Sequence, residues 1–194
     1  MVKYMIVGLF TVPVYKTTLT IDNTKLAHYC KSLSKADKDG RVISNIGGWQ
    51  SKSFVAPFNN AFKSLVDNIE KHVHIYNESV NLTTKSKIDN LWVNINGYKD
   101  VNELHNHPSA IYSGVYYVNT PKDCGNILFH HPGNISMGYD WGNKQVEFNR
   151  FNSSSWWLPS EAKTLYIFPS WLQHMVRPNL NKTQKRISIS FNIH

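Results

Sequence analysis

A chain of 194 residues fits one domain that is long enough to bury a full hydrophobic core. Its 41% hydrophobic and 13% aromatic residues exclude intrinsic disorder, and no apolar run approaches the ~18 residues that a membrane span requires. The formal net charge of +8 favours anionic partners, but the lysines are scattered, which predicts a soluble basic surface rather than a nucleic-acid interface.

The cysteines and the first residues bear on the compartment. Cys30 and Cys124 stand far apart in unlike contexts, which predicts neither a disulfide framework nor a thiolate metal site and fits a reducing cytosol. The first ten residues hold one Lys and a short apolar run, as a weak signal peptide would, but Pro13 between alternating valines favours a strand. We therefore expect one cytoplasmic domain over residues 1–194, without membrane contact.

The first part of the chain predicts an extended segment followed by two helices. Residues 4–20 are rich in β-branched and aromatic residues. Asp22 offers an N-cap for a helix from Asn23 to Leu33, and apolar residues recur at helical spacing over 59–76, which predicts a second helix. Residues 1–85 are thus expected to form a helical support region.

After about residue 88 the sequence changes to short runs of β-forming residues separated by turns. Eight short strands in about a hundred residues predict a closed double sheet, the double-stranded β-helix or jelly roll, against which the two helices pack. The expected fold class is mostly β with packed helices, and its jelly-roll core covers residues 88–194. The predicted strands are Leu91–Asn96, Glu103–His107, Tyr112–Asn119, Asn126–His130, Lys144–Phe151, Thr164–Phe168, His174–Arg177 and Arg186–Ile193.

Three histidines in this region form a candidate metal site. His105 and His107 are two residues apart on a predicted strand and therefore face the same way, and His174 opens a later strand. Imidazole nitrogen binds Fe, Zn, Cu and Ni alike, so these ligands do not choose the metal. Glu103, on the same predicted face as His105, and Asp140, from a loop, stay open as alternative third ligands.

Arg186 and Ser188 share one face of the last predicted strand. A charged Arg on the inward face of a β-barrel needs an anionic partner, and a bidentate carboxylate suits it, with the Ser hydroxyl as second donor. A metal beside a fixed guanidinium predicts a cofactor that is both a chelator and a dicarboxylate.

The order and spacing of these motifs resemble the iron(II)- and 2-oxoglutarate-dependent oxygenases, in particular uncharacterised phage and marine-bacterial members. The resemblance implies a dioxygenase that uses Fe(II), 2-oxoglutarate and O2, releases succinate and CO2, and hydroxylates an unidentified substrate. A phage-encoded member would act in the host cytoplasm. The resemblance covers nearly the whole chain and rests on Ser44–Ser51, Leu91–Asn96, His105–Pro108, Ser113–Tyr117, and Phe168 through His174 to Asn192.

The resemblance also assigns the metal ligands. His105 corresponds to the first ligand of the family's His-x-Asp/Glu…His triad and His174 to its distal His. His107 stands where the wider family has a carboxylate. Among the alternatives we favour His107 as third ligand, because it holds the family's position, and we expect a three-His site.

The cosubstrate residues follow in the same way. Arg186 and Ser188 correspond to the clamp for the distal carboxylate of 2-oxoglutarate, and Asn94 to an amide that hydrogen-bonds the cosubstrate. Three other functions stay open at this point: a cupin-type metalloenzyme, which would not need this clamp, a non-catalytic jelly-roll binding module, and a nucleic-acid demethylase that uses the basic surface. The sequence predicts neither the substrate, which could be a small molecule, a protein or a nucleic acid, nor the oligomeric state.

Overall fold

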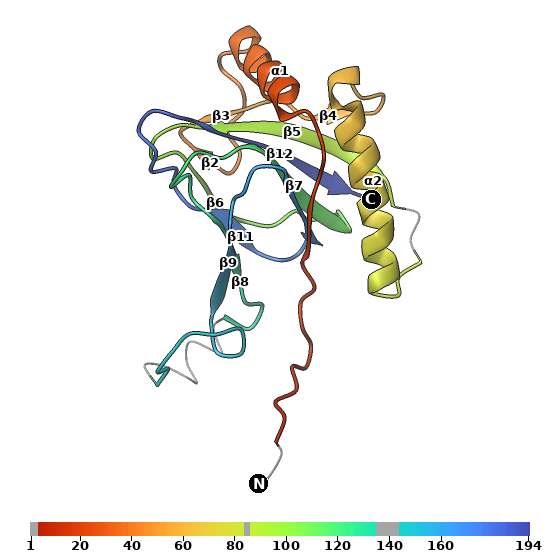
Figure 1. Ribbon diagram of the computed structural model, residues 1–194, viewed down its shortest axis with the longest axis vertical. Helices are drawn as coiled ribbons and strands as arrows, with labels where there is room; N and C mark the ends of the chain where they lie inside the picture. Colours follow the sequence, from red (N-terminus) through yellow and green to blue (C-terminus); the bar gives the residue numbers. More distant parts are fainter. Residues whose placement is uncertain (1–3, 84–85, 135–143) are drawn as a thin grey trace.

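The computed structural model describes residues 4–83, 86–134 and 144–194 and has two antiparallel β-sheets with two helices outside the larger one (Figure 1). The larger sheet has the strand order β1-β10-β7-β12-β5-β3, with β4 also paired to β5, and the smaller sheet has the order β2-β6-β11-β8-β9. Strands β5 to β12 are divided between the two sheets as a jelly roll requires, which confirms the predicted fold class.

The strands are β1 (Tyr15–Thr18), β2 (Asn45–Ile46), β3 (Trp49–Gln50), β4 (Phe54–Val55), β5 (Ile88–Asn96), β6 (Val101–His105), β7 (Tyr112–Asn119), β8 (Ile127–His130), β9 (Ser155–Leu158), β10 (Thr164–Pro169), β11 (His174–Val176) and β12 (Arg186–Ile193).

Both predicted helices are present and each runs three residues further than expected. Helix α1 spans Asn23–Ala36, and the Asp22 side chain caps it by accepting hydrogen bonds from two backbone N–H groups of the first turn. Helix α2 spans Asn60–Ser79 and is capped in the same way by Asn59. Both helices pack on the outer face of the larger sheet.

Side-chain alternation gives the larger sheet two different faces. On β12, Ile187, Ile189 and Phe191 point outward into the core beneath the helices, and β5, β7 and β10 contribute the apolar residues of their outward face to the same core. The alternate positions, including Arg186 and Ser188, point toward the smaller sheet. The space between the sheets therefore holds these polar side chains beside a smaller apolar cluster, which includes Ile127, Phe129 and Phe168.

Three expectations about strands were wrong in detail. Residues 144–151 form no strand, because the side chains of Asn149 and Asn152 bond to nearby backbone N–H groups and hold turns there. The strand that takes their predicted place in the barrel is β9. Of residues 4–20, only those of β1 pair with a neighbouring strand.

Strand β6 ends at His105 instead of continuing to His107, and it carries a bulge. His105 lies opposite His174 and Asn102 lies opposite Val176, so three steps along β6 match two along β11. The extra residue breaks the alternation on which the position of Glu103 was predicted.

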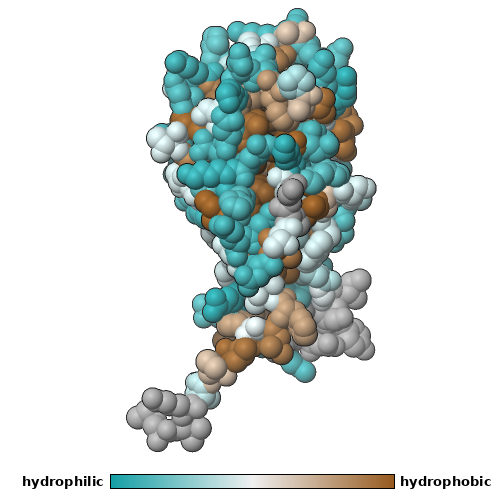
Figure 2. Space-filling view, turned by 90° about the vertical axis from the view of Figure 1, so that its right-hand side faces the viewer, coloured by the Kyte–Doolittle hydropathy of each residue, from teal (hydrophilic) through white to brown (hydrophobic). Residues whose placement is uncertain are grey.

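Residues 4–12, here called the arm, run away from the body of the molecule, with a bend at Phe10, whose φ is 54° (Figure 1). The large apolar side chains of residues 4–10 are exposed, whereas Val12 packs against the smaller core cluster, and hydrophobic surface gathers at the base of the molecule (Figure 2). Within the described ranges, no helix is both long and apolar enough to cross a bilayer.

Candidate metal and cosubstrate site

The three predicted histidines come together between the sheets. His105 ends β6, His174 begins β11 directly opposite it, and His107 lies two residues beyond β6 in the following loop. One nitrogen from each ring lies within 4.8 Å of the other two. The Nε2 atoms of His107 and His174 are 3.4 Å apart, a spacing that fits two ligands of one metal ion.

Hydrogen bonds orient two of the rings. His174 Nδ1 lies 2.9 Å from the carbonyl oxygen of Leu172, and His105 Nδ1 lies 2.6 Å from that of Glu103. Each carbonyl accepts only from a protonated Nδ1, which leaves the Nε2 lone pair free for a metal. The backbone N–H of His107 donates to the carbonyl of Ser170, which fixes the loop that carries the third ring.

Burial keeps all three imidazoles neutral at pH 7. It lowers the pKa of His105, and together with the neighbouring His105 ring it lowers the pKa of His107 to about 4 and that of His174 to about 3. Neutral imidazole is the form that binds metal. The donor set therefore fits a divalent transition ion, iron among them.

Aromatic rings surround the imidazoles. The Phe168 ring packs edge-on to His174 with centroids 4.7 Å apart, and the Trp92 ring lies 5.6 Å from that of His107. Such apolar walls restrict solvent access to a metal and strengthen electrostatic interactions beside it.

Neither alternative third ligand joins this cluster within the described structure. Glu103 is exposed, because the bulge in β6 turns its side chain outward and turns the Asn102 side chain inward. The expectation that Glu103 shares the face of His105 is therefore wrong. Asp140 lies outside the described residues.

A pocket extends from the imidazoles along the inward face of both sheets. Asn94 and Ser188, predicted to contact the cosubstrate, line it and are almost fully buried. Ser188 is in register with Asn94 on one side and with Tyr117 on the other. Arg186 is the next inward-facing residue of β12. It lies two residues before Ser188 on the strand, opposite Asn96 and on the side away from Trp92.

The Arg186 side chain is fully buried and only partly satisfied. Its Nη1 group donates to the backbone carbonyls of Cys124 and Arg177, whereas Nε and Nη2 have no hydrogen-bond partner within the described residues. Burial lowers the pKa of the guanidinium, but an arginine stays charged at neutral pH. A buried cation with two unpaired donors requires an anion, and a carboxylate can bind both nitrogens at once.

Sequence reasoning missed three polar residues of this region. The hydroxyl groups of Tyr117 and Ser160 are buried without a well-formed hydrogen bond in the described part of the chain, and Arg186 and then Ser160 lie close enough to oppose the effect of burial on the pKa of Tyr117. Burial nevertheless raises that pKa to about 12, so Tyr117 remains a donor. Its position on the inward face of a predicted strand was an available signal. Asn102 had none, because only the bulge turns it inward.

The amide of Asn94 is held from one side. Its Nδ2 donates to the hydroxyl of Ser190 at 3.2 Å, and its Oδ1 is buried without a partner within the described residues. Because a hydroxyl both donates and accepts, Ser190 can hold this amide in either orientation.

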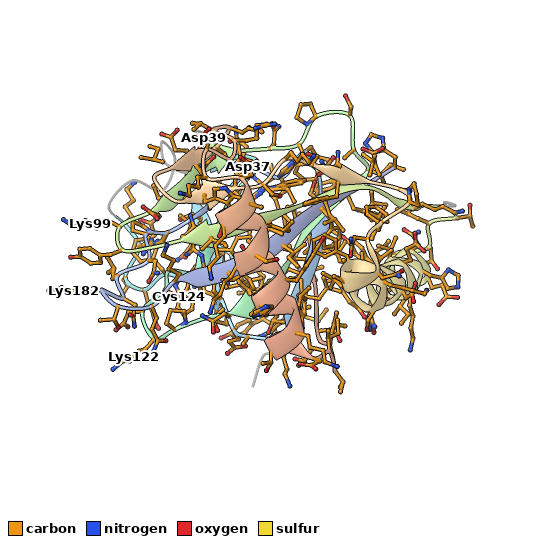
Figure 3. The ribbon with its side chains drawn as sticks, turned by 90° about the horizontal axis from the view of Figure 1, so that it is seen from above. Asp37, Asp39, Lys99, Lys122, Cys124 and Lys182 are labelled. Carbon is orange, nitrogen blue, oxygen red and sulfur yellow. The ribbon has the colours of Figure 1, made fainter. Side chains whose placement is uncertain are left out.

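The basic side chains near this end of the barrel are solvated. Figure 3 shows Lys99, Lys122 and Lys182 at one edge of the molecule, pointing away from it, with Cys124 further inside. The carbonyl of Cys124 is one of those that accept from Arg186. The lysines thus contribute to the field at this end without entering the pocket.

Comparisons with known proteins identify the family. Residues 90–192, more than half of the chain, match the model of the family described as "Putative 2OG-Fe(II) oxygenase". No match was found among curated protein sequences.

The fold is also shared with solved structures. A prolyl-4-hydroxylase from Pseudomonas putida is similar with a TM-score of 0.66 and 14% identity, over 95% of this chain and 93% of that one. HygX from Streptomyces hygroscopicus, solved with nickel and 2-oxoglutarate bound, has a TM-score of 0.61 and 10% identity over 94% and 83%. The viral collagen prolyl hydroxylase of Paramecium Bursaria Chlorella virus-1, solved with 2-oxoglutarate, has a TM-score of 0.57 and 12% identity over 93% and 94%.

The match over residues 90–192 includes all three clustered histidines and the buried arginine. A cupin and a non-catalytic binding module are thereby set aside. The chain belongs to the iron(II)- and 2-oxoglutarate-dependent oxygenases.

Proposed function

We propose that this oxygenase hydroxylates its substrate at a three-His iron site formed by His105, His107 and His174, with 2-oxoglutarate anchored by Arg186. The observation that carries the proposal is the unpaired, buried pair of guanidinium nitrogens on Arg186, placed beyond the polar pocket that begins at the imidazoles. A metal site alone suits many proteins, whereas a metal site and a buried unpaired guanidinium on the same inward face suit a chelating dicarboxylate.

When bound, iron(II) and 2-oxoglutarate would supply the oxidation: the cosubstrate loses CO2 and gains one oxygen atom of O2 to give succinate, and the other oxygen atom enters the substrate. The chain's own residues bind and orient the reactants. Arg186 and the Tyr117 hydroxyl are donors for the distal carboxylate. Ser188 and Asn94 line the path between that carboxylate and the imidazoles.

The third imidazole affects the charge of the site. With three neutral ligands the metal centre carries one more positive charge than with two imidazoles and a carboxylate. This charge favours binding of a dianionic cosubstrate and alters the metal's potential. The aromatic rings of Trp92 and Phe168 keep water from the reacting centre.

The first experiment is anaerobic. Wild-type protein is titrated with Fe(II) and then with 2-oxoglutarate, and a visible charge-transfer band is expected only when both are present. Admission of air is then expected to release succinate, and candidate pools of peptides, nucleic acids and small metabolites are screened for a gain of one oxygen atom.

Arg186→Ala and its exposed neighbour Lys185→Ala form a matched pair of variants. Arg186→Ala is expected to weaken the binding of 2-oxoglutarate by about 100-fold or more, because loss of the guanidinium leaves a buried carboxylate unpaired. Lys185→Ala is expected to change little. Unchanged cosubstrate affinity in Arg186→Ala, with metal binding intact, would contradict the assignment, and so would failure of the wild type to take up stoichiometric iron.

A further inference from the structure

The arm is unusual for an exposed segment because it is apolar. Tyr4, Met5, Ile6, Val7, Leu9 and Phe10 expose between 61% and 98% of their surface. Residues 4–12 contain no charged side chain, although the chain as a whole has a net charge of +8. Exposed apolar surface of more than a few hundred Å² in one place marks an interaction site.

The arm has an apolar neighbour on the same molecule. Gly8 passes beside Phe151, since a Cβ atom added to Gly8 would lie 3.7 Å from the Phe151 ring. Val146 and Phe148, on the same connection between β8 and β9, are also exposed. Figure 2 shows this hydrophobic surface at the base of the molecule.

The backbone of the arm is unpaired as well. Within the described structure, residues 4–12 make no backbone hydrogen bond. The arm leads into β1, which pairs with β10 along one edge and is an outer strand of the larger sheet. Tyr, Ile, Val and Phe are strong β-formers, so the arm is suited to pair with another strand.

These properties select the kind of partner. A lipid bilayer would cover the side chains but leave the extended backbone without hydrogen-bond partners, at a cost of several kcal/mol for each group. Another strand would both cover the apolar side chains and provide hydrogen-bond partners for the backbone. Two molecules of the same positive charge also repel each other least where they meet through an uncharged segment.

We propose that the arm, together with Val146, Phe148 and Phe151, forms a two-fold interface with a second copy of this chain. In such an interface the arm of one copy pairs antiparallel with the arm of the other copy. The same segment therefore forms both sides of the interface. The six large side chains of the arm expose on the order of 800 Å² per copy. That area is about what each partner contributes to a stable interface of standard size.

The test is the mass of the full chain in solution, measured by light scattering over a wide range of concentration. The wild type is expected at twice the 22.3 kDa of the monomer, with dimerisation strengthened by added salt, which screens the charge repulsion. Ile6→Asp is expected to raise the dissociation constant by about 100-fold or more, because it buries an unpaired carboxylate.

Ile43→Asp is the matched control. Ile43 is exposed to a similar extent, 74% against 69% for Ile6, but lies outside the arm. It is expected to leave the dimer intact, and circular dichroism checks that both variants are folded. Amide exchange is expected to slow at residues 4–12 in the wild type and not in Ile6→Asp.

The proposal does not depend on the identity of the substrate or the metal. It is overturned if the wild type is monomeric at every concentration, if both variants dissociate equally, or if the arm is unprotected in the dimer. Capture of a monomeric wild type by phosphatidylcholine vesicles would overturn it too and assign the arm to a membrane surface.

Discussion

His105 and His174 face each other directly across the antiparallel pair of β6 and β11, with ring centroids 4.4 Å apart. Two ligands that are 69 positions apart in sequence are thus held by one sheet register. The third, His107, is held by a loop. We therefore expect the site to tolerate changes at the third position better than at the other two.

Substitutions at position 107 test the ligand set. His107→Ala is expected to weaken Fe(II) binding at least tenfold, whereas His107→Asp is expected to retain iron through its carboxylate and to weaken 2-oxoglutarate severalfold, since it lowers the charge of the centre. Glu103→Ala is the control and should change neither affinity. Equal loss of iron in Glu103→Ala would show that the carboxylate is a ligand after all.

Removing the Tyr117 hydroxyl tests the far end of the pocket. Tyr117→Phe is expected to weaken the binding of 2-oxoglutarate about tenfold, which is the effect of one hydrogen bond to a charged group. The metal affinity is expected to stay unchanged. Calorimetric titration of the Zn(II) or Ni(II) form measures this without turnover. An unchanged dissociation constant would remove Tyr117 from the donors and leave the predicted pair of Arg186 and Ser188.

Ser190 tests the orientation of Asn94. In the structure Asn94 donates to Ser190 through Nδ2. A dicarboxylate offers only acceptors, so donation from Nδ2 to the cosubstrate requires the opposite orientation of the amide, in which Oδ1 accepts from the Ser190 hydroxyl. Ser190→Ala is expected to weaken the binding of 2-oxoglutarate by about threefold to tenfold. Ser190→Thr should restore most of the affinity, and a Thr variant as weak as the Ala variant would rule out this role.

The stability of the metal-free protein should depend on pH. The pKa values of His107 and His174 are lower in the folded chain, about 4 and about 3, than the value near 6.5 of an unfolded chain. The unfolded chain therefore binds protons first, so stability is full above about pH 6.5 and falls as pH decreases toward 4.

Thermal melts of the metal-free protein between pH 7 and pH 5 are expected to show a decrease of several degrees. His174→Gln should flatten the dependence, since it removes the most strongly shifted group. A steeper decrease in that variant would place the origin of the effect elsewhere in the chain.

Much of this arrangement follows from residue patterns. Helical spacing located both helices, alternation located most of the barrel strands, and the His-x-His pair with His174 marked residues that the fold brings together. Lys144–Phe151 misled because it alternates like a strand, whereas the side chains of Asn149 and Asn152 accept hydrogen bonds from nearby backbone N–H groups and hold turns there. Ser160 and Asn102 could not be predicted, because a turn and a bulge place them, and neither has a clear pattern in sequence.

The bulge in β6 also determines what the pocket can admit. With regular alternation the Glu103 side chain would enter the passage that now holds Asn102, and at about 5 Å from a bound carboxylate it would cost roughly 3 kcal/mol at an effective dielectric of 20. A single extra residue thus excludes a negative charge from a passage that has to accept a dianion. Without that bulge the same sequence would form an anion-repelling passage, with all three histidines still present.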